Sequence, residues 1–245
     1  MSNMFSRSEL IYGKEAIELL KSKRVSIFGI GGVGGYVCEA LVRTGVSHFL
    51  LVDADRVTLT NLNRQIIATQ ETIGHHKTEV MKVRLKSINP HCEVDIINKF
   101  FLEENDLDYD FKKIDYIVDA VDTVKAKIAL VLLANKYHIP IISSMGAGNK
   151  VNPMGFMVTD INKTEVDPLA KAIRLQLRKL GIKKLKVVYS KEPPLKPLDK
   201  NSDEESNKRE IPGSNAFVPS ACGLLIASEV IRDLTNEVAR DELKR

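Results

Sequence analysis

Three glycines near residue 30 are spaced as in loops that bind phosphate groups. Gly29, Gly31 and Gly34 form a G-x-G-x-x-G pattern directly after an apolar run and before a helical pattern. The first glycine permits a tight turn, the second lets a phosphate approach the backbone, and the third lets helix and strand pack closely. Free amide groups at the start of the helix would face the phosphates. The spacing therefore predicts a nucleotide-binding site.

A carboxylate follows where such sites bind ribose. Asp53 ends the next apolar run, 24 residues beyond Gly29, and an acid in this place can accept a hydrogen bond from a ribose hydroxyl. The glycine pattern alone favours NAD, so it is specific for the fold but not for the reaction. An NAD-dependent oxidoreductase is one alternative, which the relative binding of NADH and ATP would test.

The polar stretch after Asp53 favours a triphosphate over a dinucleotide. A pyrophosphate carries about two negative charges, whereas a triphosphate carries about four and needs fixed cations and a metal-binding carboxylate. Arg64 and Lys77 would be the cations, and Asp122, ending a later strand, would bind Mg²⁺. Singly, each could be a surface charge or a helix cap, but together at strand ends they favour ATP. The further polar residues expected at this site are Asp55, Thr60 and Asn61.

The elements that would position these residues alternate between strands and helices. Helical spacing at 77–88 and 125–138 separates the strands, and a short amphipathic helix is expected at 9–21. This alternation predicts an α/β fold with a Rossmann-like, doubly wound and mostly parallel sheet. Ligands bind such sheets at the carboxyl ends of the strands. The apolar runs predict strands at 25–30, 48–53, 93–98, 115–122 and 139–144.

The chain changes character near residue 160. Residues 1–160 are expected to form the nucleotide-binding domain with an N-terminal helical arm, and residues 161–245 a C-terminal extension of the same fold. Residues 191–215 are rich in Pro, Ser and mixed charge, which predicts a mobile loop. The other elements expected here are strands at 155–161 and 186–190, a basic helix at 168–180 and a helix at 219–234 that docks on the sheet.

Composition narrows the class of protein. With 36 basic and 32 acidic residues the net charge is only +4, so a charged partner would need a local cluster of charge. The cysteines Cys38, Cys92 and Cys222 form no C-x-x-C pair, which favours buried thiols over disulfides or a zinc site. Because no signal peptide or membrane-spanning run is present, we expect a cytoplasmic protein without membrane association.

Four separated motifs resemble those of the ubiquitin-activating-type adenylyltransferases. GxGGxG, DxDxVxxxNLNRQ, GxxK and a strand ending D-A-V-D follow in the family's order over about residues 5–160, which would make this part an ATP-binding adenylation domain. The resemblance implies that a carboxylate attacks the α-phosphate of ATP, with Mg²⁺ on Asp122. It also implies a homodimer in which Arg7 reaches the phosphates bound by the other subunit. The residues it implies hold ATP are Gly31, Asp53, Thr60, Asn61, Arg64 and Lys77, and the expected catalytic residues are Arg7, Arg64, Lys77 and Asp122.

Further patterns are similar to those of tRNA threonylcarbamoyladenosine dehydratases. RxELxxG, SSMGAGNKVNP, DPLAKAIRxxLRK and FVPSACGLLIASEVI extend this resemblance through nearly the whole chain. It implies that ATP activates the threonyl carboxylate of a modified tRNA adenosine, whose ring then closes with net loss of water. It also suggests contact with a sulfur-acceptor protein of a cysteine-desulfurase system, and no DNA partner. The alternative is an adenylyltransferase that activates a ubiquitin-like sulfur-carrier protein, but most of these enzymes carry two C-x-x-C pairs, which this chain lacks.

A basic segment points independently to RNA. Residues 168–191 contain eight Lys or Arg and no acid. In a helix, Lys171, Arg174 and Arg178 would share one face and could contact tRNA phosphates without reading sequence. A solvated face on a docked helix is the alternative interpretation. The opposite, apolar face would carry Leu169, Ile173, Leu177 and Leu180.

Overall fold

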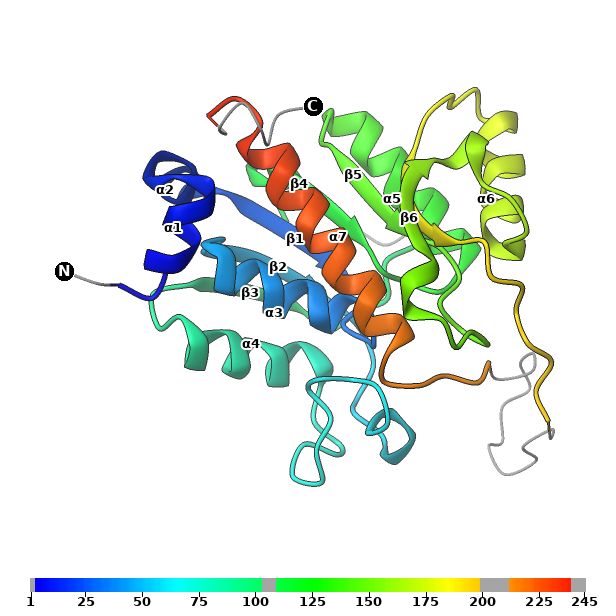
Figure 1. Cartoon of the computed structure of the whole chain (residues 1–245), viewed down its shortest axis with the longest axis horizontal. Coiled ribbons are helices and arrows are strands. Elements are labelled where there is room, and N and C mark those ends of the chain that lie inside the picture. Colours follow the sequence, from blue (N-terminus) through cyan, green and yellow to red (C-terminus); the bar gives the residue numbers. More distant parts are fainter. Residues whose placement is uncertain (1–2, 103–108, 199–211, 239–245) are drawn as a thin grey trace.

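One seven-stranded sheet runs through the fold (Figure 1). The computed structural model describes residues 3–102, 109–198 and 212–238. The strand order is β3-β2-β1-β4-β5-β7-β6, parallel throughout except for β6, which runs antiparallel to β7. The predicted α/β fold with a mostly parallel sheet is confirmed. The strands are β1 Arg24–Phe28, β2 His48–Val52, β3 Glu93–Ile97, β4 Tyr116–Asp119, β5 Ile141–Ser144, β6 Phe156–Asp160 and β7 Lys186–Ser190.

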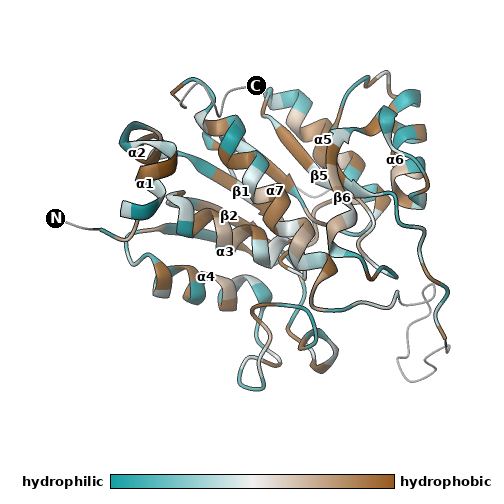
Figure 2. Cartoon of the chain, in the orientation of Figure 1, coloured by the Kyte–Doolittle hydropathy of each residue, from teal (hydrophilic) through white to brown (hydrophobic). Residues whose placement is uncertain are grey.

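The inner strands are apolar because helices cover both faces of the sheet. All four residues of β4 are buried, as are four of the five in both β1 and β2, the pattern that a parallel sheet between two helical layers requires. Figure 2 shows this concentration of hydrophobic residues in the central strands. The edge strand β3 instead exposes Glu93 and Asp95.

The helices form two layers. α2, α3, α4 and α7 pack on one face around a core that includes Leu20, Leu41, Leu85 and Ile226. α5 and α6 lie on the other face. The α-helices are α1 Ser6–Tyr12, α2 Lys14–Ser22, α3 Gly34–Thr44, α4 Lys77–Ile88, α5 Val124–Tyr137, α6 Pro168–Lys179 and α7 Val218–Thr235. Short 3-10 helices lie at Leu59–Asn61, Phe111–Lys113, Pro153–Gly155 and Ile161–Lys163.

The N-terminal arm consists of two helices, so the prediction of one helix over residues 9–21 is wrong. Gly13 has a φ of +86° and ends α1 before α2 begins. A glycine adopts this backbone conformation without the steric cost of a Cβ atom. α2 buries Ala16, Ile17 and Leu20, whereas none of the residues of α1, all of them described, is buried.

The C-terminal part of the chain completes the sheet and covers it. β7 lies between β5 and β6, so residues from both parts of the chain share one sheet. α7 packs closely on α3, because a Cβ atom on Gly223 would lie 2.4 Å from the carbonyl oxygen of Val33. The predicted docking of the last helix is therefore confirmed.

The predicted mobile loop 191–215 is described only at its two flanks, because residues 199–211 lie outside the described part of the chain. Both flanks are bonded to Asn149. The amide of Leu195 donates to the Asn149 carbonyl oxygen at 2.7 Å, and the amide of Gly213 donates to its side-chain oxygen at 2.6 Å. The described flanks thus lie beside the loop that follows β5.

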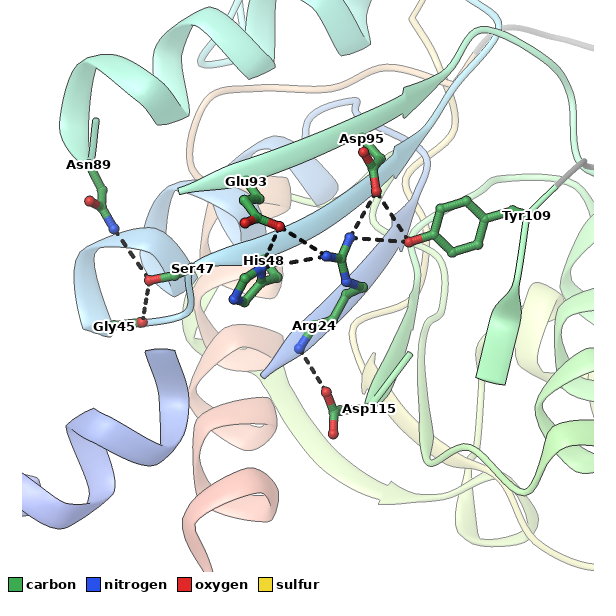
Figure 3. Close-up of polar contacts among 9 residues, drawn as sticks. All are labelled: Arg24, Gly45, Ser47, His48, Asn89, Glu93, Asp95, Tyr109 and Asp115. Atoms are coloured by element: carbon green, nitrogen blue, oxygen red, sulfur yellow. Dashed lines mark hydrogen bonds and ion pairs between the residues drawn. The ribbon is translucent and has the colours of Figure 1, made fainter. Parts of the chain in front are cut away.

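A polar network joins the amino ends of β1, β2 and β3 (Figure 3). Arg24 donates to Asp95 at 2.8 Å and to Glu93 at 3.2 Å, and His48 Nδ1 lies 3.0 Å from the same Glu93 oxygen. The backbone amide of Arg24 donates to Asp115 at 2.8 Å. These contacts stabilise the strand register at the edge of the sheet opposite the carboxyl ends.

Candidate functional site

The glycine loop lies where the order of the strands reverses. It follows β1, whose neighbours β2 and β4 belong to the two halves of the sheet. In open α/β sheets the crevice at this position, outside the carboxyl ends of the strands, is where ligands bind. The loop leads directly into α3, so the N-terminus of this helix follows the carboxyl end of β1. The geometry thus matches the predicted nucleotide site.

The glycines differ in what they make room for. Gly29 has a φ of +89°, and a Cβ atom there would lie 2.6 Å from the carbonyl oxygen of Ala120. A Cβ atom on Gly34 would lie only 1.8 Å from the Gly29 carbonyl oxygen. Gly31 is open, because the nearest atom to its Cβ position is Gln65 Nε2 at 3.8 Å. Two glycines permit close packing, and the middle one leaves space for a ligand.

Asp53 supports the glycine loop from the end of β2. Its carboxylate accepts hydrogen bonds from the amide of Ile30 at 2.6 Å and from the amide of Asp55 at 2.8 Å. Burial raises the pKa of the Asp53 carboxyl, while Lys77 and the two amides act in the opposite direction. Asp53 therefore shapes the loop whether or not a ribose contacts its remaining lone pairs.

Lys77 is held in place by Asp55. Its ammonium lies 2.7 Å from the Asp55 carboxylate, and its amide donates to the Asp55 carbonyl oxygen at 3.1 Å. Lys77 opens α4, as predicted, and it is buried. Asp55 already fixes the position of this buried cation. Little reorganisation would therefore be needed for it to interact with a bound phosphate.

The NLNRQ segment is ordered by its own side chains. The amide of Thr58 donates to Asn61 Oδ1 at 3.2 Å, and the Asn61 amide donates to the Thr58 carbonyl oxygen at 3.0 Å. The hydroxyl of Thr60 lies 3.3 Å from that of Thr58. Arg64 Nη1 donates to the Thr60 carbonyl oxygen at 2.8 Å and to Asn63 at 3.0 Å. The buried Asn61 thus shapes this turn. The half-buried Arg64 side chain lies beside the glycine loop, and its Cγ is 3.5 Å from the Cβ position of Gly32.

Asp122 lies in a loop rather than at the end of a strand, which corrects the predicted strand 115–122. β4 ends at Asp119, whose Oδ1 accepts the amide of Val121 at 3.2 Å. This bond turns the chain out of the sheet, as aspartate side chains commonly do in turns. Asp122 is exposed beside the Ala120 carbonyl that contacts the glycine loop.

Two buried polar atoms at this site were not anticipated from the sequence. Gln65 Oε1 and His76 Nδ1 find no hydrogen-bond partner among the described residues. A buried polar group without a partner is uncommon in proteins and calls for an explanation such as a missing ligand or water. Gln65 is also the nearest side chain to the open Gly31 position. The sequence signal that could have indicated a role for Gln65 is its position directly after Arg64 in the NLNRQ motif.

Arg7 is not brought to the glycine loop of its own chain. It lies exposed on α1, beside the amino end of β1, whereas the loop follows the carboxyl end of that strand. Five residues at about 3.3 Å each separate the two ends by roughly 16 Å. Every other predicted ATP-binding residue comes from a segment that borders the carboxyl ends of the strands.

The basic helix is confirmed as α6, but its faces differ from the prediction. Lys171 and Arg178 are exposed, whereas Arg174 is half-buried and donates to the carbonyl oxygen and the hydroxyl of Thr164 at 2.9 and 2.5 Å. Leu180 does not join the apolar face; it is 48% exposed because it follows the last helical residue, where the chain turns away.

The three cysteines are buried, as predicted. Burial raises the pKa of the Cys222 thiol to about 12, and its sulfur lies 3.5 Å from the Ser144 hydroxyl. A buried thiol with a raised pKa is a poor nucleophile. Among the described helices, none is long and apolar enough to cross a membrane.

Known proteins are similar to this chain in both sequence and fold. The chain is 44% identical over 253 residues to the tRNA threonylcarbamoyladenosine dehydratase of Bacillus subtilis, across 100% of this chain and 98% of that protein. It is similar to the crystal structure of the Escherichia coli tRNA N6-threonylcarbamoyladenosine dehydratase in complex with ATP, with a TM-score of 0.87 and 32% identity over 97% and 96% of the two chains. A molybdopterin-synthase adenylyltransferase of Haemophilus influenzae is 31% identical over 152 residues, 58% of this chain and 62% of that protein.

These likenesses confirm the resemblance that the motifs indicated. The rival carrier-activating type is the more distant one, because its similarity ends after little more than half of the chain. The family model extends through the glycine loop, the NLNRQ segment, α6 and α7, over residues 5–245. The chain therefore belongs to the ThiF family.

Proposed function

We propose that this chain is an ATP-dependent tRNA threonylcarbamoyladenosine dehydratase. The threonyl carboxylate of the modified adenosine attacks the α-phosphate of ATP, pyrophosphate leaves, and the activated carboxyl group then closes a ring with net loss of water. The observation that carries the proposal is the full-length similarity to a dehydratase of B. subtilis, combined with a glycine loop and cations at the reversal point of the sheet.

The arrangement of charge suits this reaction. Negative charge increases on the phosphate oxygens as the carboxylate attacks, and preorganised cations stabilise that charge. Lys77 is fixed by Asp55, and Arg64 is fixed by the Thr60 carbonyl oxygen. The step needs no protein nucleophile, which agrees with the burial of Cys222. Orientation and electrostatics are therefore the main contributions of this site.

Asp122 fits the magnesium ion that such a reaction requires. Mg²⁺ usually binds one or two protein carboxylates together with substrate phosphates and water. Within the described residues no group of three or more His, Cys, Asp or Glu could hold a metal ion alone, so the phosphates would supply the other ligands. When bound, Mg²⁺ would neutralise phosphate charge beside the glycine loop.

A homodimer would complete the site with Arg7 from the second subunit. Arg7 lies at the opposite end of β1 from its own glycine loop, so it can act only on another copy or not at all. The helix that carries it also exposes Leu10 and Ile11, at 78% and 57%. Such an unburied apolar surface on α1 is suited to contact with a second subunit.

The RNA surface that we propose begins with Lys171 and Arg178. Both are exposed on α6, whereas Arg174 is bonded to Thr164. α6 is capped by Asp167, whose carboxylate accepts the amide of Gly146 in the loop after β5 at 3.1 Å. A tRNA on this helix would therefore lie next to the candidate site. A sulfur-acceptor partner stays a prediction from the family resemblance, and a cytoplasmic location stays a prediction from the sequence.

Mass analysis of tRNA nucleosides tests the activity directly. Incubation of threonylcarbamoyladenosine-containing tRNA with the protein, ATP and Mg²⁺ should yield a nucleoside lighter by one water, together with AMP and pyrophosphate. The matched reaction with Asp122→Asn protein should leave the nucleoside unchanged. Formation of an adenylate on a ubiquitin-like protein ending in Gly-Gly, without any change in the tRNA, would instead favour the carrier-activating alternative.

A further inference from the structure

A buried ion pair lies directly behind the loop that carries Asp122. Asp119 is the last residue of β4 and Lys127 lies in the first turn of α5. The Lys127 ammonium is 3.1 Å from both carboxylate oxygens of Asp119, and the two side chains are 1% and 0% exposed. Asp119 is the first residue of the D-A-V-D motif but was given no role there, and Lys127 lies outside the motifs.

Hydrogen bonds extend this pair to the end of β5. Lys127 donates to the Ser144 carbonyl oxygen at 2.6 Å, and the Ser143 hydroxyl donates to the Asp119 carboxylate. The same carboxylate accepts the amide of Val121 at 3.2 Å. The ends of β4 and β5 and the start of α5 are thus joined around the loop 120–123.

Stability alone gives little reason for such a pair. Replacing a buried ion pair by apolar residues of similar volume is often neutral or stabilising, since both charges must be removed from water. The rest of β4 and the facing part of α5 are apolar, with Ile117, Val118 and Leu130 fully buried. The ion pair therefore has a role that an apolar contact between α5 and β4 could not fill.

The loop in front of the pair is fixed from two sides. The Ala120 carbonyl oxygen lies against Gly29 of the glycine loop, and the Val121 amide is bonded to Asp119. Asp122 is the next residue. A change in the direction of the Asp119 carboxylate would therefore move Asp122 relative to the glycine loop.

We propose that Asp119 and Lys127 are positioning residues, which hold the Asp122 carboxylate at the distance from the glycine loop that a nucleotide-bound Mg²⁺ requires. This inference rests on the proposed function, because it takes Asp122 as the magnesium ligand. The pair acts through the loop 120–123 and touches neither substrate.

The test uses the full chain with both charges removed, Asp119→Asn with Lys127→Met, since Lys127→Met alone would leave a buried carboxylate without its partner. ATP affinity is measured by calorimetry with and without Mg²⁺, alongside kcat. The ATP affinity without Mg²⁺ should stay within about threefold of that of the unaltered protein. The gain from Mg²⁺, which is the ratio of the ATP affinities with and without the metal, should fall about tenfold. kcat should fall by about 10- to 100-fold, the cost of a displacement near 1 Å.

A matched control lies at the other end of β4. Lys186 donates to Asp233 at 2.6 and 2.7 Å, and Tyr116, the first residue of β4, donates to the same carboxylate. Lys186→Met with Asp233→Asn should lower the Tm and leave both the gain from Mg²⁺ and kcat unchanged. If Asp119 and Lys127 had only a structural role, both double variants would lower the Tm without a change in the gain from Mg²⁺.

The proposal is overturned if the Asp119 and Lys127 double variant keeps the unaltered gain from Mg²⁺ and the unaltered kcat. Should that variant fail to fold, Ser143→Ala removes one hydrogen bond to Asp119, and its gain from Mg²⁺ should fall about threefold; no change there would equally overturn the proposal. If the unaltered protein itself gains no ATP affinity from Mg²⁺, it is the assignment of Asp122 in the proposed function that fails.

Discussion

Lys77 and Asp55 illustrate how single residues prepare this site before any ligand binds. Lys77 has almost no exposed surface, yet its partner Asp55 has a side chain that is 51% exposed. Within this ion pair, the Lys77 side chain is therefore buried and the Asp55 side chain is open to solvent. An ammonium group that a single carboxylate already holds in place needs little reorganisation when a phosphate binds beside it.

At the same scale, Arg64→Ala and Asp122→Asn should each reduce kcat/KM by at least ~100-fold, because each removes one preorganised charge from the phosphates or the metal ion. Steady-state kinetics with modified tRNA checks this, and Lys136→Gln, an exposed change at the far end of α5, serves as the control. Calorimetry that showed tighter binding of NAD than of ATP would contradict the assignment of the site.

At the scale of elements, α6 offers a test of RNA contact that spares the fold. Changing Lys171 and Arg178 to Gln should flatten the slope of log affinity against log salt by ~0.7–0.9 per charge, and weaken all tRNAs about equally. Both side chains are exposed, so stability should change by only about 0.5 kcal/mol. Filter binding at several salt concentrations checks this. An unchanged slope would assign these residues to a solvated face.

Arg174 needs to be kept out of that variant. Its guanidinium bonds to the Thr164 carbonyl oxygen and hydroxyl and links α6 to the preceding 3-10 helix. Arg174→Gln should therefore lower the free energy of unfolding by about 1–3 kcal/mol, since it leaves half-buried acceptors without a donor. Chemical denaturation of this single variant, beside Arg178→Gln as the control, distinguishes a packing role from an RNA role.

A second element contact, between α3 and α4, should make stability depend on pH. Glu39 of α3 is buried, which opposes its ionisation, but hydrogen bonds from Arg84 and Arg43 outweigh burial and lower the pKa of its carboxyl. A lowered folded-state pKa contributes stability above the unfolded value of about 4.3, and that contribution is lost as pH falls through the folded value. Glu39→Gln should therefore lower the Tm at pH 7, and this effect should shrink as the pH falls below about 4.3. A constant difference across this range would exclude the ionic contribution.

At the scale of the whole molecule, the shared site predicts complementation between two inactive variants. Arg7→Ala and Asp122→Asn should each be inactive as homodimers. After mixing, half of the dimers carry both chains, and one of their two sites is intact, so about a quarter of the sites should recover. Activity measured after subunit exchange checks this, with exchange confirmed by native mass spectrometry. Failure to recover in exchanged dimers would show that Arg7 does not act across the interface.

The fold could be predicted because its signals are local. The alternation of apolar runs with helical spacing placed every strand of the sheet within a few residues, and the Gly29 to Gly34 pattern predicted a nucleotide site in the loop after β1. Strand β4 was overextended because apolar character continues to Val121, while the hydrogen bond from Val121 to Asp119 that ends the strand leaves no trace in periodicity.

The residues that only the tertiary structure revealed are those whose partners lie far along the chain or on another element. Lys127 looked like an ordinary helical lysine until packing buried it against Asp119 and β5. Gln65 is the side chain nearest to the open Gly31 position, and its Oε1 has no hydrogen-bond partner among the described residues; the sequence indicated neither fact. Residue types and spacing determine which backbone forms and which ligand class it suits. Burial and hydrogen-bond partners decide which side chains hold that site in shape, because they depend on segments that the sequence does not place side by side.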